Sequence, residues 1–361
     1  MHIIQEKVSK LFRYAKLEFL FAKRNEFSNI HPELKNVWKK KFRQMIRYSS
    51  NRVFPIVEEF LTVKISKLKE YTAKDETTKA PILICVFRND FGKLRFFMEH
   101  YRKIGIQHFV FLDNGSADGS LEFLLEQEDV TVYSCIHEFA SNRKIAWINR
   151  MIAELGDNKW YLMVDSDEFV TYLGNSEHRI DELIAQCESK GYKRVGGLML
   201  DMYATGNLFD SNSENFMEQC RYLDRDTYDF SWAANGIRIT GGPRKRIFGT
   251  PMKLSKYCLF YFEEDDVIPS SHFMIPFEKG FNVPVSMAIL HYKFTDEKDY
   301  EKILDAVETG KYSNNSAEYK TYFKGVKENP QLTFYDEKHS MIFSEDNLKE
   351  ISFIKNVFAS N

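Results

Sequence analysis

Two aspartates separated by one residue follow an apolar run in the middle of the chain. The run is Trp160 to Val164 (WYLMV), and Asp165 and Asp167 come directly after it. Two carboxylates at this spacing can share one hard divalent cation, because Mg²⁺ and Mn²⁺ prefer oxygen ligands and bind through one or two carboxylates together with phosphates. A turn with solvated acids would give the same pattern, but the position after a buried strand favours a metal site.

A second polar segment, Asp113 to Ser120 (DNGSADGS), closes another apolar run. Ser116 and Asp118 are suited to cap the helix that follows. Capping does not explain Asp113, which lies at the end of the expected strand. We therefore treat Asp113 as a candidate binding residue.

Cations gather beside two glycines in the segment Gly241 to Arg246 (GGPRKR). Such groups could meet a diphosphate or an anionic substrate, and Arg244 is the best single candidate. A solvated turn between strands would look the same. Arg143, near the start of a predicted helix, could also reach a phosphate or lie on the surface.

Alternating strands and helices must position these groups. Apolar runs predict strands at 81–87, 108–113, 130–135 and 160–164, with helical patterns between them at 91–101, 118–127 and 141–155. This alternation is typical of βαβ units and a parallel sheet, in which ligands bind beyond the carboxyl ends of the strands. No Gly-x-Gly-x-x-Gly follows the first strand, so the fingerprint of a dinucleotide-binding fold is missing.

Four blocks of the chain resemble glycosyltransferase family 2, and they occur in the right order. The blocks are FRND from Phe87, HYRKIG from His100, LDNGSADGS from Leu112 and VDSDEF from Val164. The similarity spans residues 80–295 and is greatest to a bacterial branch linked to surface polysaccharides. It implies a GT-A fold, a nucleotide-diphospho-sugar donor, with a UDP-sugar expected, and inversion at the anomeric carbon.

The resemblance assigns the nucleoside to the first two strand ends. By analogy, Asn89, Asp90 and Asp113 hold the nucleoside, with Arg88 beside them. Asp90 stands where the branch more often has glutamate.

The resemblance assigns the metal and the pyrophosphate to the strand end at residue 165. Asp165 and Asp167 would hold Mn²⁺ or Mg²⁺ together with the donor pyrophosphate. His291, in LHYKF after an apolar strand, would be a third metal ligand. A lone histidine is more often a satisfied residue of the core or its rim.

Inversion requires a carboxylate or histidine that takes the proton of the acceptor hydroxyl. The chain has no clear Glu-Asp pair where many family 2 enzymes keep this base. Asp201, which closes the apolar strand VGGLMLD, is the first candidate, and His272, in SSHF, is a second on the acceptor side. The acidic run Glu263 to Asp266 is of a kind that is usually solvated.

The charge is distributed unevenly along the chain. Residues 1–70 carry 16 Lys/Arg and 7 Asp/Glu, whereas the rest carries 34 and 45. A basic leader on an acidic body predicts an anionic contact such as a membrane surface, with packing on the body as the alternative. No motif indicates a nucleic-acid partner.

The five cysteines form no C-x-x-C pair, which favours a reducing compartment. We see no signal peptide and no apolar run of about 18 residues. We therefore expect a cytoplasmic protein whose basic leader allows peripheral association with the inner face of the cell membrane.

Together these patterns predict an α/β protein of the GT-A type, with a Rossmann-like, mostly parallel sheet flanked by helices. Residues 1–78 would be a basic helical extension, 79–295 the glycosyltransferase domain and 296–361 a helical C-terminal segment. The predicted activity is metal-dependent, inverting transfer of a sugar to a saccharide or lipid-linked acceptor, in surface polysaccharide or lipopolysaccharide synthesis.

Two alternatives stay open. A sugar nucleotidyltransferase also uses such a sheet and an acidic metal site, but FRNDFG after the first strand is not its Gly-rich, basic signature. A non-catalytic relative could bind sugar nucleotide or polysaccharide without turnover. Loss of the metal carboxylates would indicate such a relative, and here both are present.

Overall fold

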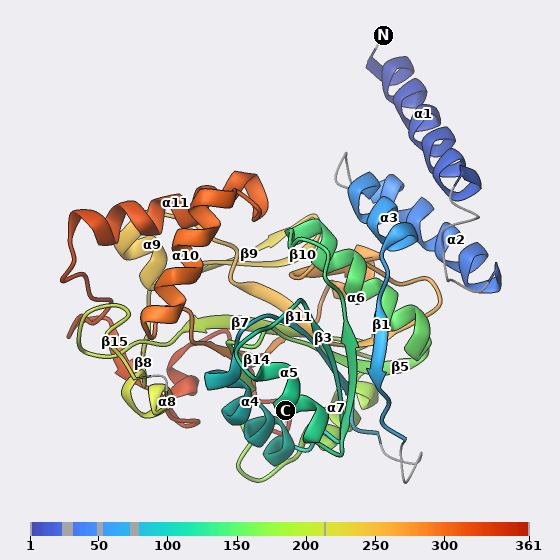
Figure 1. Ribbon diagram of the computed structural model, residues 1–361. Helices are drawn as coiled ribbons and strands as arrows, with labels where there is room; N and C mark the ends of the chain where they lie inside the picture. Colours follow the sequence, from blue (N-terminus) through green and yellow to red (C-terminus); the bar gives the residue numbers. More distant parts are fainter. Residues whose placement is uncertain (1, 24–31, 49–52, 73–78, 213, 360–361) are drawn as a thin grey trace.

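A nine-stranded sheet forms the centre of the molecule, in the order β1-β4-β3-β2-β5-β11-β7-β14-β6 (Figure 1). The computed structural model describes residues 2–23, 32–48, 53–72, 79–212 and 214–359. The strands of this sheet are β1 (Ser66–Lys69), β2 (Ile82–Phe87), β3 (His108–Asp113), β4 (Val130–Ser134), β5 (Lys159–Met163), β6 (Glu168–Thr171), β7 (Arg194–Asp201), β11 (Ser255–Phe262) and β14 (Val285–His291).

Most strands of the sheet run in one direction. Strands β4, β3, β2 and β5 are mutually parallel, and β7 is parallel to β14. Strand β11 lies antiparallel between β5 and β7, so these two groups share one direction, while β1 and β6 are antiparallel edge strands. The predicted α/β fold with a mostly parallel sheet and flanking helices is confirmed.

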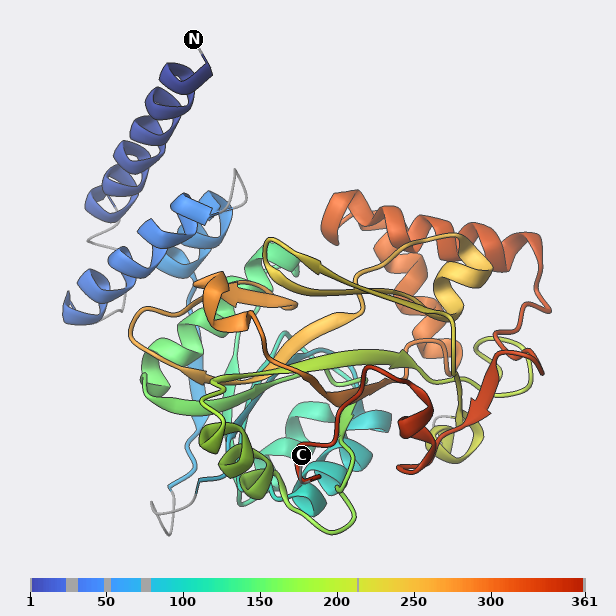
Figure 2. The same ribbon diagram turned by 180° about the vertical axis from the view of Figure 1, so that it is seen from behind.

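Both faces of the central strands are buried, which explains why their sequences are continuously apolar. In β2, Leu83, Cys85 and Phe87 pack on one side of the sheet, and Ile84 and Val86 pack on the other. Figures 1 and 2 show the helices that cover these two sides. The first side holds α4 (Phe91–Ile104), α5 (Ser120–Glu126) and α7 (Ile180–Ser189), and the second holds α6 (Ser141–Leu155).

The N-terminal segment packs over α6. It forms α1 (His2–Lys23), α2 (Pro32–Tyr48) and α3 (Val53–Thr62), whose Trp38, Phe42 and Phe60 belong to the same buried cluster as Trp147 of α6. The segment also supplies β1, which pairs with β4 and was not predicted. The helical extension therefore shares the core of the sheet domain, and its predicted end at residue 78 lies outside the described residues.

The C-terminal segment begins with two helices, α10 (Glu297–Thr309) and α11 (Ser313–Glu328). Asp296 caps α10, since its carboxylate accepts a hydrogen bond from the Asp299 amide at 3.1 Å. The helices pack on a cluster that includes Phe294 and Tyr322. Smaller elements complete the fold: α8 (Phe216–Gln219), β8 (Tyr222–Asp224), β9 (Tyr228–Ala233), β10 (Gly236–Gly241), α9 (Gly242–Phe248), β12 (Val267–Ser270), β13 (Phe273–Ile275) and β15 (Ser340–Ile342).

A buried histidine in α4 should make the stability depend on pH. His100 Nε2 lies 2.8 Å from the carbonyl oxygen of Val170, and burial lowers the pKa of His100 to about 4. Below an unfolded-state pKa of about 6.5 the unfolded chain binds more protons at this position, so stability is lost as the pH falls from 6.5 towards 4. We expect the free energy of unfolding to fall more between pH 7 and pH 5 in the wild type than in His100→Gln, whose amide can still donate to Val170. Urea titrations at both pH values would measure this, and equal losses in the two proteins would contradict it.

Candidate active site

A cavity of about 680 Å³ opens where the parallel strands end. Its walls come from the segments that follow β2, β3, β5 and β14, and from α10 and α11. The volume falls within the roughly 300–1,000 Å³ that is usual for small-molecule sites, and the position beyond the carboxyl ends of the strands is where α/β sheets bind ligands.

The two aspartates of the predicted metal site lie in the turn between β5 and β6, and both line this cavity. The turn is held by Glu168, whose carboxylate accepts a hydrogen bond from the Asp165 amide at 2.8 Å. Glu168 is itself buried and paired with the buried Lys256 of β11. The side chains of Asp165 and Asp167 remain 36% and 26% exposed, so both carboxylates are accessible from the cavity.

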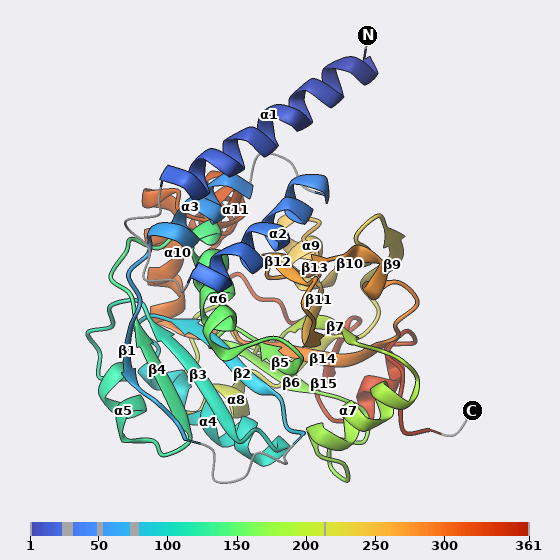
Figure 3. The ribbon, with the colours of Figure 1, turned by 90° about the vertical axis from the view of Figure 1, so that its right-hand side faces the viewer.

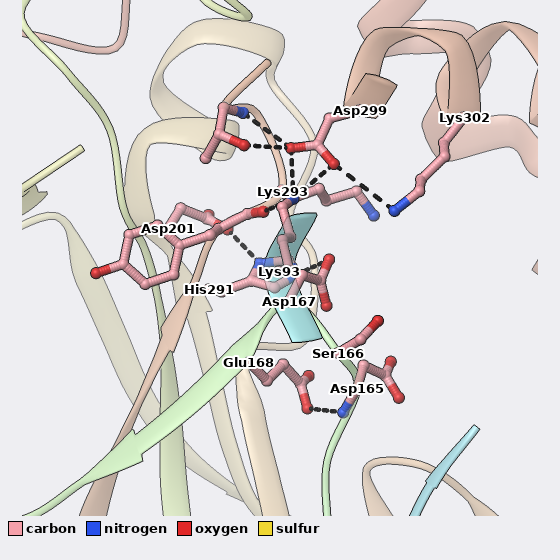
Figure 4. Close-up of polar contacts among 12 residues, drawn as sticks. Lys93, Asp165, Ser166, Asp167, Glu168, Asp201, His291, Lys293, Asp299 and Lys302 are labelled. Carbon is pink, nitrogen blue, oxygen red and sulfur yellow. Dashed lines mark hydrogen bonds and ion pairs between the residues drawn. The ribbon is translucent and has the colours of Figure 1, made fainter. Parts of the chain in front are cut away.

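His291 stands between two carboxylates at the end of β14 (Figure 4). Its Nδ1 lies 2.8 Å from Asp201 Oδ1, and its Nε2 lies 3.6 Å from Asp167 Oδ2. Asp201 also accepts a hydrogen bond of 2.7 Å from Nε of Arg244. A buried line of charge therefore runs from Arg244 through Asp201 and His291 to Asp167 at the cavity surface.

This line of charge shifts the protonation of its members. Burial alone would lower the pKa of His291, but Asp167 and Asp201 raise it to about 9. Burial opposes ionisation of Asp167, yet His291, Lys93 and Lys302 hold its pKa well below the usual range. Asp167 is therefore an anion at neutral pH.

The three predicted metal ligands lie on one wall of the cavity without forming a closed cluster. The Asp165 carboxylate is paired with Lys144 of α6. Across the described ranges, the group whose acidic or histidine ligand atoms all lie within 4.8 Å of one another is Glu263, Asp265 and Asp266. Lys279 contacts all three of these acids, and Lys193 and Arg194 pair with two of them, so this cluster is already occupied by side-chain cations.

The residues nevertheless fit a divalent metal by their chemistry. Carboxylate oxygens and an imidazole nitrogen are ligands that Mn²⁺ accepts. Asp201 engages Nδ1 of His291, and a metal would bind at Nε2 by displacing the proton that Asp167 and Asp201 hold on the ring. A carboxylate on the second ring nitrogen is the usual support of a metal-binding histidine.

The two loops expected to hold a nucleoside are tied to each other. Asn89 Oδ1 accepts a hydrogen bond of 2.8 Å from the Ala117 amide, and Asp90 accepts hydrogen bonds from Ser166 and Lys302. Both residues line the cavity. The Asp113 carboxylate instead accepts the amides of Gly115 and Ser116, at 3.1 and 3.0 Å, and it does not line the cavity. Asp113 thus holds the backbone of the loop that follows β3 without lining the cavity.

Arg88 lies at the exposed edge of the cavity next to these loops. Among the residues that the structure describes, no carboxylate forms an ion pair with it, although most other lysines and arginines of the cavity are paired. An unpaired guanidinium at this place is suited to an anionic ligand.

Besides Asp113, two more of the predicted site residues lie outside the cavity. Arg143 donates to the carbonyl oxygen of Glu138 at 2.6 Å and does not line the cavity, whereas the next residue, Lys144, does. Asp201 is 1% exposed, and both of its carboxylate oxygens are engaged. This burial does not favour the predicted role of Asp201 as a base that faces the acceptor, because its carboxylate contacts His291 and Arg244 instead of the cavity.

His272 and Arg244 do line the cavity. Nδ1 of His272 lies 3.1 Å from the Ser255 carbonyl oxygen, which can only accept, so this nitrogen carries the proton and Nε2 keeps its lone pair. Burial and Lys256 lower the pKa of His272 to about 4, which keeps the ring neutral. Arg244 is buried and also donates to Glu318 of α11 at 3.0 Å.

No protein-family model and no curated protein matches the chain. Solved structures similar to it include the crystal structure of S. aureus TarS 1-349, with 12% identity over 69% of this chain and 73% of that chain and a TM-score of 0.32. Another is the crystal structure of HddC from Yersinia pseudotuberculosis, with 9% identity over 62% and 97% of the two chains and a TM-score of 0.32. Because both scores are low, the function must be inferred from the geometry of the site.

Proposed function

We propose that this chain is a glycosyltransferase that uses a nucleotide-diphospho-sugar donor, with a UDP-sugar expected, and a divalent metal. The observation that carries the proposal is the wall of Asp165, Asp167 and His291, supported from behind by Asp201, in a cavity at the ends of parallel strands. The acceptor would be a saccharide or lipid-linked saccharide of surface polysaccharide or lipopolysaccharide synthesis.

Asp165, Asp167 and His291 would hold Mn²⁺ or Mg²⁺. The metal, when bound, offsets the negative charge that develops on a diphosphate leaving group. Arg88 would bind an anionic part of the donor at the open edge of the cavity. Asn89 would join the loops that follow β2 and β3 beneath the nucleoside, and Asp90 would join the first of them to Ser166 in the turn after β5.

His272 is the group we assign to proton transfer. Inverting transfer forms a bond from the acceptor oxygen to the anomeric carbon and breaks the bond from that carbon to the diphosphate, while the hydroxyl proton passes to a base. Nε2 of the neutral His272 has a free lone pair at the cavity wall. Its pKa, lowered to about 4 by burial and Lys256, is close to that of an ordinary carboxylate.

The test is calorimetric binding of a panel of UDP- and GDP-sugars, with Mn²⁺, with Mg²⁺ and with chelator. One donor should bind with metal only, and Asp167→Asn should weaken that binding by at least about 100-fold, since loss of a metal ligand exceeds the usual effect of losing a supporting residue. Asp346→Asn is the matched control, because Asp346 is 87% exposed and lies outside the cavity. If no sugar nucleotide binds with any metal, or if Asp167→Asn binds as the wild type does, the proposal fails.

A further inference from the structure

Helix α1 has two apolar faces, and one of them packs on α2 and α3. Leu17, Leu20 and Phe21 are buried in the cluster that α1 shares with α2 and α3. Leu11 and Phe12 lie on the opposite side by the 100° rotation per residue of an α-helix, and they are 74% and 75% exposed. Large apolar side chains this exposed mark an interaction surface when they lie together.

The same helix projects away from the rest of the molecule, as Figures 1 and 3 show. Its N-terminal half, which carries Leu11 and Phe12, is the part that extends beyond α2 and α3. The described residues contain no helix long and apolar enough to cross a membrane.

The charge around this surface is strongly positive. Helices α1 and α2 together contain eleven Lys/Arg and three Asp/Glu. Lys10, Lys16 and Lys40 are exposed. Exposed apolar side chains flanked by cations are the composition of a helix that lies in the interface of an anionic bilayer.

We propose that α1 binds an anionic membrane surface, inserting Leu11 and Phe12 between lipid headgroups while the lysines and arginines of α1 and α2 meet lipid phosphates. A second copy of the chain is the less suitable occupant. A symmetric contact through the same face would bring two cationic segments together, and like charges oppose such a contact.

The test uses vesicles and the full chain. Flotation with vesicles of phosphatidylcholine and phosphatidylglycerol (3:1), and with phosphatidylcholine alone, should show binding to the anionic vesicles only. Raising the salt from about 0.05 to 0.5 M should weaken it, because screening shortens the reach of the charges. Leu11→Ser/Phe12→Ser should bind at least about tenfold more weakly, since burial of one such side chain accounts for more than a factor of ten.

Phe230→Ser/Trp232→Ser is the matched control. It also removes two exposed large apolar side chains, 41% and 52% exposed, but from β9 of the body, and it should bind as the wild type does.

Equal binding to both kinds of vesicle, or unchanged binding of the Leu11/Phe12 variant, would overturn the proposal. So would a dimer in sedimentation velocity that this variant dissociates. Binding of sugar nucleotides is measured without vesicles, so failure here is distinct from failure of the proposed activity.

Discussion

Asp201→Asn is expected to lower the free energy of unfolding by about 3–5 kcal/mol, the usual result of removing one partner from a buried ion pair. Asparagine keeps the shape of the side chain and can still accept from His291. It leaves the charge of Arg244 buried, and of the two carboxylates that pair with Arg244 among the described residues, Glu318 remains, at 3.0 Å from Nη1. Urea unfolding at pH 7 would measure the loss.

The same variant should also weaken metal-dependent donor binding, because Asp201 orients His291 towards the cavity. A loss of about 10- to 100-fold is typical when the supporting carboxylate of a metal-binding histidine is removed. Glu318→Gln provides the comparison: it removes the other partner of Arg244 but leaves the contact between Asp201 and His291 intact. If both variants weaken donor binding equally while both stay folded, Asp201 has no special role in positioning His291.

The role of Asp201 shows where prediction from sequence ends. The apolar run before it identified the strand, and the strand end suggested a base that faces the acceptor. Its partners Arg244 and His291 lie 43 and 90 residues away in the sequence. Only the pairing of β7 with β14 brings Asp201 and His291 into register, and no local pattern contains that information.

The strands themselves could be predicted because burial on both faces leaves a strong signal. The predicted runs at 81–87, 108–113 and 130–135 agree with β2, β3 and β4 to within one residue. By contrast, β1 (Ser66–Lys69, SKLK) is an edge strand with mostly exposed side chains, so its sequence resembles the basic segment around it. Edge strands need no apolar alternation, and this one gave no signal.

The direction of single side chains in α6 was equally hard to predict. Arg143 was predicted to reach the donor phosphate. In the structure its neighbour Lys144 contacts Asp165, whereas Arg143 donates to the carbonyl oxygen of Glu138. The side chains of consecutive helical residues differ in direction by 100°. A prediction that is wrong by one residue therefore selects a side chain on the outer surface instead of one that lines the cavity.

The sequence patterns did not indicate that the C-terminal helices line the cavity. The sequence from 296 onwards is polar and was predicted as an appended helical segment, but α10 and α11 form one wall of the site. The contact that fixes α10 joins Lys93 of α4 to Asp299, 206 residues away. The side chains of these two residues are 5% and 4% exposed. A lysine is rarely buried without a partner, so a lysine on the apolar face of α4 was the sequence feature that could have indicated a distant carboxylate.

Lys93→Met should therefore cost about 3–5 kcal/mol of unfolding free energy, because it removes the close cation of the buried Asp299 carboxylate and leaves Lys302 at 3.8 Å. Lys93 Nζ contacts both carboxylate oxygens of Asp299, at 2.6 and 2.7 Å, and also donates to the Tyr292 carbonyl at 2.8 Å. Hydrogen exchange should become faster in α10, which loses its contact with Lys93 and keeps the ion pair of Lys302 with Asp90.

The double variant Lys93→Met/Asp299→Asn distinguishes loss of the pair from general damage. If the ion pair is what holds α10, the double variant should cost clearly less than the sum of the two single changes, since neither charge is left unpartnered. Lys349→Met is the surface control: its pair with Asp346 is 63% and 87% exposed, and its loss should change stability by no more than about 0.5 kcal/mol. Additive single costs would show that Lys93 and Asp299 contribute independently, and α10 would then have to be held by the apolar contacts around Phe294 and Tyr322.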